Sequence, residues 1–128
     1  MTSIFPATED ELQKQVVRHL TAILPSDCFL HHSPNEGIRK VQFKMKLQTM
    51  GTQFGWPDLE IFAPDTATHN GLPQCLFIEL KLAKGKLSGK QISIRDQLLR
   101  AGFPWSLCRS VEDVETFLAE HIKLRTVA

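Results

Sequence analysis

Three charged residues, Asp58, Glu79 and Lys81, lie in or beside two short apolar segments of this chain. Glu79 and Lys81 alternate with leucines in a segment that is typical of a strand, so both side chains point to the same face. Charges on the inner face of a central strand cost stability, and their presence calls for a reason. Paired carboxylates suit a hard divalent cation such as Mg²⁺, which prefers oxygen ligands and keeps several waters.

Asp58 precedes one predicted strand and Glu79 lies on the next, so a hairpin-like pairing would bring both carboxylates to one end of a sheet. The backbone carbonyl of Leu80 would add a third oxygen. The Lys81 ammonium would orient or help to deprotonate a bound water, or neutralise charge in the transition state. The alternative is structural: a surface ion pair of Glu79 with Lys81, and a Pro-Asp turn at Asp58.

The elements that must position these residues follow from capping and periodicity. Thr8 and Glu11 form a predicted capping box at the start of a helix that Pro25 ends, and Ser88 and Gln91 form a second one. The predicted helices are 8–24, 38–50, 88–101 and 110–122, and the predicted strands are 28–31, 58–62, 75–82 and 104–108, with a loop at 64–74. This α-β-α-β-β-α-β-α order predicts an α/β or α+β fold with one central mixed sheet.

The 128 residues suit one domain, 1–128, and no apolar run approaches the length of a membrane span. The N-terminal residues lack the pattern of a signal peptide, and three scattered cysteines indicate reduced thiols in a cytoplasmic protein. The net charge is only +1, yet residues 37–109 hold eleven basic and five acidic side chains. This basic middle is either a lysine-rich solvated surface or a face for nucleic acid.

Several motifs together resemble a known family. Gly55–Asp58 followed by Glu79–Lys81 is similar to the core of PD-(D/E)xK nucleases. More narrowly, the chain resembles the VRR-Nuc (virus-type replication-repair nuclease) branch, through His32–Gly37, Gly51, Gly55–Asp58, Ile78–Lys81, Lys86–Ser88 and Gln91. The resemblance implies a restriction-endonuclease-like αβββαβ core and metal-dependent phosphodiester hydrolysis. It implies Mg²⁺, for which Mn²⁺ would substitute, held by Asp58, Glu79 and the Leu80 carbonyl, with Lys81 acting on the water.

Two helical residues carry over from the same resemblance. Glu11 matches an acidic residue that the family places on the first helix beside the metal, and the alternative is its capping box. Gln91 matches a glutamine near the start of the helix after the catalytic lysine. The alternative is that Gln91 serves only in the predicted capping box with Ser88. Glu36 lies in the Asn-Glu-Gly turn without an assigned role.

The basic residues follow the proposed site or flank the second helix, and we expect them to contact phosphates without reading bases. They are Arg39, Lys40, Lys44, Lys46, Lys84, Lys86 and Lys90. Minimal VRR-Nuc proteins resemble Holliday-junction resolvases, which implies branched DNA, two symmetric cuts and a homodimer. A flap or fork nuclease, a non-catalytic DNA-binding subunit and a sequence-specific restriction enzyme are the alternatives. Such a protein would work inside a cell, and a phage origin would fit it.

Overall fold

The computed structural model describes residues 5–34 and 41–125, and its elements follow the predicted order. They are α1 (Glu9–Ile23), β1 (Phe29–His31), α2 (Val41–Thr49), β2 (Leu59–Ala63), the 3-10 helix η1 (Asp65–Ala67), β3 (Gln74–Leu80), α3 (Gly89–Arg100), β4 (Trp105–Cys108) and α4 (Val111–Ala119). The predicted loop at 64–74 contains η1, and β3 ends at Leu80, two residues before its predicted end.

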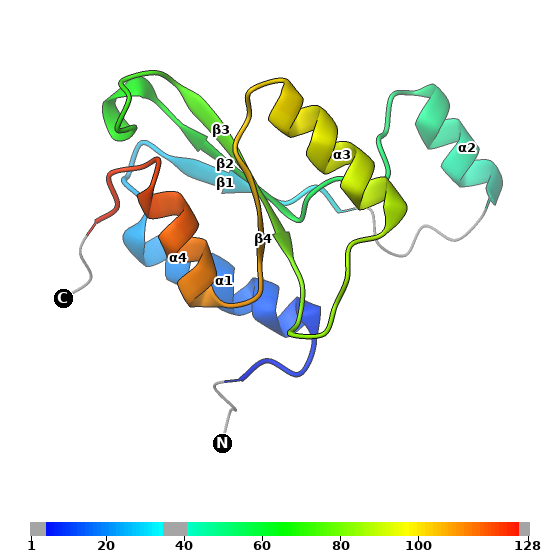
Figure 1. Cartoon of the computed structure of the whole chain (residues 1–128), viewed down its shortest axis with the longest axis horizontal. Coiled ribbons are helices and arrows are strands. Elements are labelled where there is room, and N and C mark those ends of the chain that lie inside the picture. Colours follow the sequence, from blue (N-terminus) through cyan, green and yellow to red (C-terminus); the bar gives the residue numbers. More distant parts are fainter. Residues whose placement is uncertain (1–4, 35–40, 126–128) are drawn as a thin grey trace.

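The four strands form one mixed sheet in the order β1-β2-β3-β4. β1 pairs with β2, and β2 with β3, in antiparallel fashion, whereas β4 runs parallel to β3 (Figure 1). Parallel neighbours need a crossover connection, and α3 supplies it. The predicted αβββαβ core is therefore confirmed, and α2 is inserted between β1 and β2.

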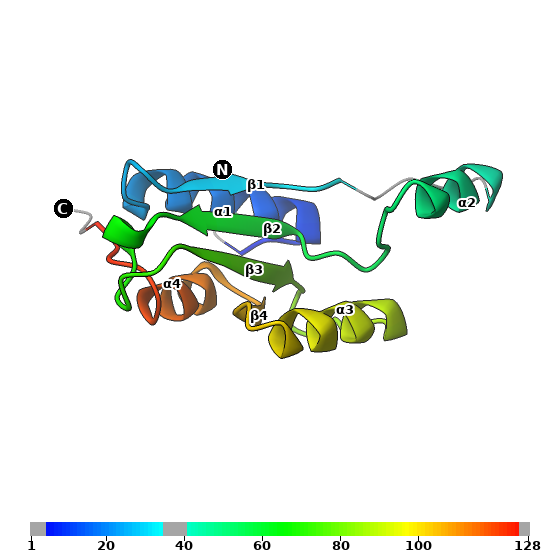
Figure 2. The ribbon, with the colours of Figure 1, turned by 90° about the horizontal axis from the view of Figure 1, so that it is seen from above.

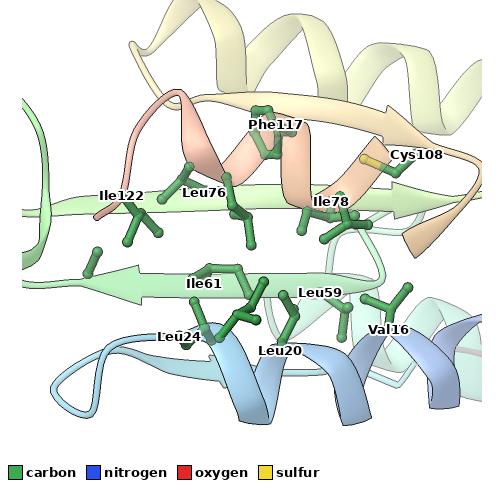
Figure 3. Packing of buried hydrophobic residues seen from close by; sticks show 14 of the residues in the cluster. Val16, Leu20, Leu24, Leu59, Ile61, Leu76, Ile78, Cys108, Phe117 and Ile122 are labelled. Carbon is green, nitrogen blue, oxygen red and sulfur yellow. The ribbon is translucent and has the colours of Figure 1, made fainter. Parts of the chain in front are cut away.

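Helices cover both faces of this sheet (Figure 2). α1 and α4 bury one face with a large apolar cluster that includes Leu76, Ile78 and Leu80 of β3 (Figure 3). On the opposite face, Phe77 packs in a smaller cluster with Ile94 and Leu98 of α3. Because neighbouring strand residues point to opposite faces, Glu79 lies on the same face as Phe77, toward α3.

The three helices that cover the sheet begin with side-chain caps, two of them at the predicted residues Thr8 and Ser88. The Oγ1 atom of Thr8 accepts the amide of Glu11 at 3.1 Å, Ser88 caps α3, and the Oγ atom of Ser110 accepts the amide of Asp113 at 3.1 Å. The buried face of α1 consists of the residues predicted by their periodicity, Leu12, Val16, Leu20 and Ile23. Within the described residues, no helix is both long and apolar enough to cross a bilayer.

α2 stands out from the rest of the molecule at one end (Figures 1 and 2). The predicted helix 38–50 is confirmed over Val41–Thr49, and residues 38–40 lie outside the described part of the chain. Among the residues of α2, none is buried. Its apolar side chains are exposed, including Val41 at 69% and Met45 at 59%. α2 therefore presents apolar surface that the described part of this chain does not cover.

Candidate active site

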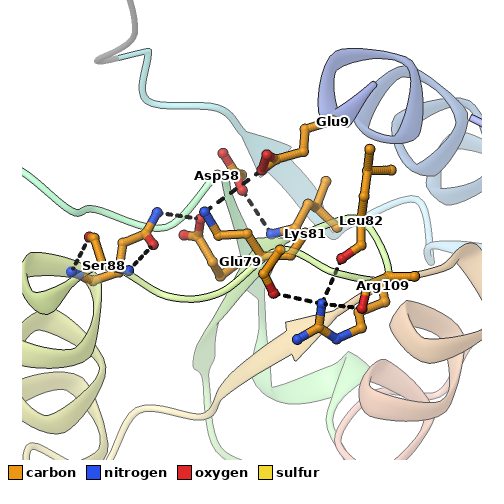
Figure 4. A network of polar contacts seen from close by, with 11 residues as sticks. Glu9, Asp58, Glu79, Lys81, Leu82, Ser88 and Arg109 are labelled. Carbon is orange, nitrogen blue, oxygen red and sulfur yellow. Dashed lines mark hydrogen bonds and ion pairs between the residues drawn. The ribbon is translucent and has the colours of Figure 1, made fainter. Parts of the chain in front are cut away.

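The antiparallel pairing of β2 with β3 brings Asp58 and Glu79 together. Leu59 pairs with Ile78, so the next position along each strand places Asp58 across from Glu79. The backbone amide of Leu80 donates to the Oδ2 atom of Asp58 at 2.8 Å (Figure 4). Asp58 also lies close enough to Glu79 to raise its pKa through charge and hydrogen bonding. The two predicted carboxylates thus meet at one end of the sheet.

Glu79 is a deeply buried acidic side chain, with only 3% of its surface exposed. Burial is the largest of the effects that together raise its pKa from 4.5 to about 9, and the charge and hydrogen bond of Asp58 are the next largest. The ammonium of Lys81 lowers the same pKa, and the charge of Glu9 raises it. The site therefore concentrates more negative charge than its one lysine offsets, and a bound cation would relieve this excess.

Lys81 follows β3 directly and is held at both its backbone and its side chain. Its amide donates to the carbonyl of Cys108 at 3.1 Å. Its side chain is 14% exposed, and the Nζ atom lies 3.8 Å from a carboxylate oxygen of Glu9 (Figure 4). The lysine therefore lies beside the two carboxylates with restricted freedom, as a residue that acts on the reacting groups requires.

The acidic residue of α1 at this site is Glu9. The carboxylate of Glu11, the residue predicted from the family resemblance, accepts the backbone amide of Ala7 at 2.8 Å and so caps the helix. Glu9 lies one turn before Leu12 and two turns before Val16, on the helix face that turns toward the sheet. The buried face of this helix begins at Leu12, and continuing it one turn toward the N-terminus leads to Glu9. This pattern in the sequence would have favoured Glu9 over Glu11.

Gln91 has both of the roles that the sequence left open. Its amide oxygen accepts the backbone N–H of Ser88 at 2.9 Å, and its own backbone N–H donates to the Ser88 hydroxyl at 3.2 Å, which completes a capping box. Its side-chain nitrogen donates to Glu79 at 2.9 Å. The cap fixes the side chain at the start of α3, and the remaining amide group reaches the buried carboxylate.

Gly55 allows the segment before Asp58 to pack against the start of α3. Its φ of +84° lies in the left-handed region. A Cβ atom at this position would lie 2.6 Å from the carbonyl carbon of Lys90 and 2.8 Å from the amide nitrogen of Gln91. Glycine is therefore required both by the backbone conformation and by the close approach. This contact sets the distance between Asp58 and Gln91.

His32, which begins the His32–Gly37 motif of the family resemblance, lies beside the site. Its Nδ1 atom lies 2.6 Å from the backbone carbonyl of Asp58. The contact joins the end of β1 to the start of β2. The histidine thereby anchors the main chain of Asp58, while the side chain of Asp58 is held by the amide of Leu80.

The donor set at the site fits a hard divalent cation. In the described residues, no group of three or more His, Cys, Asp or Glu side chains is arranged to hold a metal ion, so the two carboxylates need a further oxygen. The N–H and C=O of a strand residue point to the same side of the strand. Since the N–H of Leu80 points to Asp58, its carbonyl does too. Two carboxylates and one carbonyl leave positions for water and substrate, as Mg²⁺ prefers.

Of the basic residues predicted to contact DNA, Lys84, Lys86 and Lys90 are exposed. Lys84 and Lys86 lie in the segment that leaves the site, and Lys90 directly precedes Gln91. The ammonium of Lys90 lies 5.2 Å from the centre of the Phe54 ring. Arg39, Lys40 and Glu36 lie outside the described residues.

The cysteines form no part of this site. All three thiols, Cys28, Cys75 and Cys108, are free, as predicted. Burial raises the pKa of Cys75 and of Cys108 to about 11. These thiols are therefore protonated at neutral pH and unsuited to act as nucleophiles.

A mixed sheet that carries an aspartate, a glutamate and a lysine at one end defines a nuclease of the PD-(D/E)xK type. The family model for the VRR-NUC domain matches residues 6–112, and the chain belongs to this family. A solved structure described as a "VRR_NUC domain protein" has the same fold, with a TM-score of 0.70 and 24% sequence identity over 95% of this chain and 93% of that chain. No curated protein matches the chain. Nucleases of this type act on DNA and usually use a divalent metal.

We expect Gly55→Ala to destabilise the protein by more than its φ alone would explain. A left-handed alanine costs about 1–2 kcal/mol, and the clash with the α3 backbone adds to this cost. Gly71→Ala is the matched control, because its φ is +73° and nothing lies within 4 Å of the added Cβ. Urea unfolding would measure both free energies. Equal losses in the two variants would show that the close approach does not constrain the site.

We expect Glu79→Gln to stabilise the metal-free protein by about 1–2 kcal/mol at neutral pH. The amide has nearly the shape of the carboxyl group and keeps an oxygen for Gln91. It also removes the cost of protonating Glu79 on folding, which arises at neutral pH because the pKa rises from 4.5 to about 9. Thermal unfolding in a chelating buffer would detect a higher Tm. The exposed control Glu120→Gln should shift the stability by less than about 0.5 kcal/mol. A lower Tm for Glu79→Gln would contradict a free-energy cost of burying this carboxyl group.

Proposed function

We propose that the protein, with residues 1–128 as a single nuclease domain, is a Mg²⁺-dependent, structure-specific DNA endonuclease that cuts four-way junctions as a homodimer. The observation that carries the proposal is the convergence of Asp58, Glu79 and Lys81 at one end of the sheet of a VRR-NUC fold. The oxygen donors also suit Mn²⁺, which we expect to substitute for Mg²⁺.

In this proposal, Asp58, Glu79 and the Leu80 carbonyl hold the cation. A bound divalent cation lowers the pKa of its water and polarises a phosphate oxygen. Hydrolysis forms a bond from the water oxygen to phosphorus and breaks the bond from phosphorus to the leaving oxygen. Lys81 keeps a positive charge beside the phosphate, where negative charge develops in the transition state.

The surrounding side chains position these groups. Gln91 holds the carboxylate of Glu79 through a hydrogen bond of 2.9 Å. Glu9 holds the ammonium of Lys81 at 3.8 Å and takes the place that the sequence assigned to Glu11. Held side chains favour catalysis, because a reaction geometry that is fixed in advance needs no ordering in the transition state.

Recognition of branched DNA rests on phosphate contacts in this proposal. Lys84, Lys86 and Lys90 are exposed beside the site, and Lys44 and Lys46 are exposed on α2. Arg39 and Lys40, which precede α2, belong to the same proposed set. Phosphate contacts give affinity and orientation without reading bases. A substrate would therefore be selected by its shape.

The homodimer is supported by two considerations. A four-way junction requires two symmetric cuts, whereas one chain offers one site. α2 projects from the molecule with exposed apolar side chains, among them Phe43 at 50%, and Met50, which directly follows the helix, is 73% exposed. The amide of Met50 still donates to Lys46 at 3.1 Å, so the helical repeat continues to this residue and places it, seven positions after Phe43, on the same side. This face would contact a second copy.

The cleavage activity is tested with labelled four-way junction, flap, linear duplex and single-stranded DNA in the presence of Mg²⁺. We expect the junction to be cut fastest and EDTA to abolish cleavage. Asp58→Asn should reduce the rate by at least about 10³-fold while DNA binding is retained, because the amide is a poorer cation ligand. Asp96→Asn, on the exposed surface of α3, is the matched control and should cut at the wild-type rate.

The outcomes of this assay separate the alternatives. Preferred cutting of flaps or forks would replace the junction assignment. Cutting of plain duplex at the same rate would contradict selection by shape, and discrete fragments from long duplex would indicate a sequence-specific enzyme. Binding without cleavage by the wild-type chain would indicate a DNA-binding subunit. Full activity of Asp58→Asn would overturn the assignment of the site.

The dimer is tested by light scattering on a size-exclusion column. We expect the wild-type protein to elute at twice the mass of its 14.5 kDa chain. The double substitution Phe43→Glu, Met50→Glu should give monomers, because charges would be buried in the interface. Leu72→Glu, at an equally exposed apolar residue outside α2, is the control and should stay dimeric. A wild-type monomer at all concentrations would contradict the dimer.

A further inference from the structure

Arg109, which lies between β4 and α4, binds the turn that follows the catalytic strand. Its Nη1 atom donates to three backbone carbonyls, those of Leu82 at 2.6 Å, Ala83 at 3.3 Å and Gly85 at 2.8 Å (Figure 4). Its backbone amide donates to Asp113 at 2.9 Å, which ties it to the first turn of α4. One guanidinium therefore holds the 82–85 turn against the rest of the domain.

The 82–85 turn lies against the side chain of Lys81. A Cβ atom on Gly85 would be 3.2 Å from both Cβ and Cδ of Lys81, so the backbone of Gly85 forms a wall along the aliphatic part of the lysine. The amide of Lys81 also donates to Cys108, the neighbour of Arg109 in the sequence. Two consecutive residues, Cys108 and Arg109, thus hold the main chain of Lys81 and the turn that confines its side chain.

We propose that Arg109 is a positioning residue for Lys81, an inference that rests on the proposed nuclease function. A lysine has a flexible stem and loses rotamer entropy when it is ordered. Glu9 binds only the tip of the side chain, whereas the Gly85 wall confines its stem. Without Arg109, three carbonyls lose a shared donor, the turn relaxes and the ammonium moves. Displacement of a catalytic group by about 1 Å can reduce a rate by about 10²-fold.

The contacts favour positioning over direct binding of phosphate by Arg109. The Nη1 atom is already occupied by carbonyl oxygens of the chain itself. A phosphate-binding arginine contributes to affinity and to its salt dependence. A positioning arginine changes the rate of the chemical step at saturating DNA and leaves the affinity unchanged. The two roles are therefore distinguishable by measurement.

The first test uses Arg109→Met and Arg109→Lys, with Arg18→Met on the exposed surface of α1 as the matched control. We expect single-turnover cleavage at saturating enzyme to slow by 10- to 100-fold in both variants, because methionine has no donor and the shorter lysine side chain does not carry its donor to the position of Nη1. DNA affinity and its salt dependence should stay within twofold of the wild type. Loss confined to affinity, or wild-type rates in both variants, would overturn the proposal.

A double-substitution cycle shows whether Arg109 acts through Lys81. In a Lys81→Met background, we expect Arg109→Met to slow the residual cleavage by less than twofold, because the group that it positions is gone. Losses that multiply would indicate an independent role and would overturn the proposal. Gly85→Ala is a second variant, since it disturbs the same wall without changing Arg109, and it should also slow cleavage at unchanged affinity.

A measurement without DNA keeps this inference separate from the proposed function. Hydrogen exchange of the Gly85 amide, which donates to Leu82 at 2.9 Å, should be at least 10-fold faster in Arg109→Met than in the wild type, with α1 unaffected. NMR of the Lys81 side chain should show greater motion in the same variant. Unchanged exchange and unchanged motion would overturn the positioning role, whereas a wild-type protein that cuts no DNA would overturn only the nuclease activity.

Discussion

The pairing of β2 with β3 places two carboxyl groups side by side, and contacts with neighbouring residues offset part of the free-energy cost of burying them there. Glu79 is buried beside Asp58, and burial and like charge both disfavour its ionised form. The amide of Leu80, the side chain of Gln91 and the charge of Lys81 each offset part of this cost. A fold rarely retains such an arrangement for stability alone, which is why perturbed carboxyl groups indicate functional sites.

Most of the fold was predictable because its signals are local. Alternation along β3 and the caps at Thr8, Ser88 and Ser110 depend on neighbouring residues and on the periods of strands and helices. The convergence of Asp58 with Glu79 was predicted only on the condition that their strands pair, and the structure meets this condition. The exposure of α2 was not predictable, because periodicity identifies an apolar face without saying what covers it.

The remaining site residues depend on contacts between distant segments. Glu9 and Glu11 are both in the first turn of α1, and the angle at which α1 meets the sheet decides which one faces Lys81. His32 and Arg109 contact backbone carbonyls of the site. Every residue has a backbone carbonyl, so the types of the partner residues do not predict these contacts. Gln91 was predicted as either a cap or a site residue, and its two amide atoms allow both.

The net charge of +1 conceals two opposed local charges that have different consequences. In the proposed function, the exposed Lys84, Lys86 and Lys90 attract phosphates whether or not a cation is bound. The charge of Asp58 repels the same phosphates until a divalent cation offsets it, and a cation that binds Glu79 would displace the proton that this residue holds at neutral pH. DNA would therefore associate with the domain through its basic rim, and the scissile phosphate would approach the carboxylates only in the metal-loaded protein. In the proposed function, the carboxyl pair that is costly to bury in the metal-free fold is thus the same pair that would make hydrolysis depend on the cation.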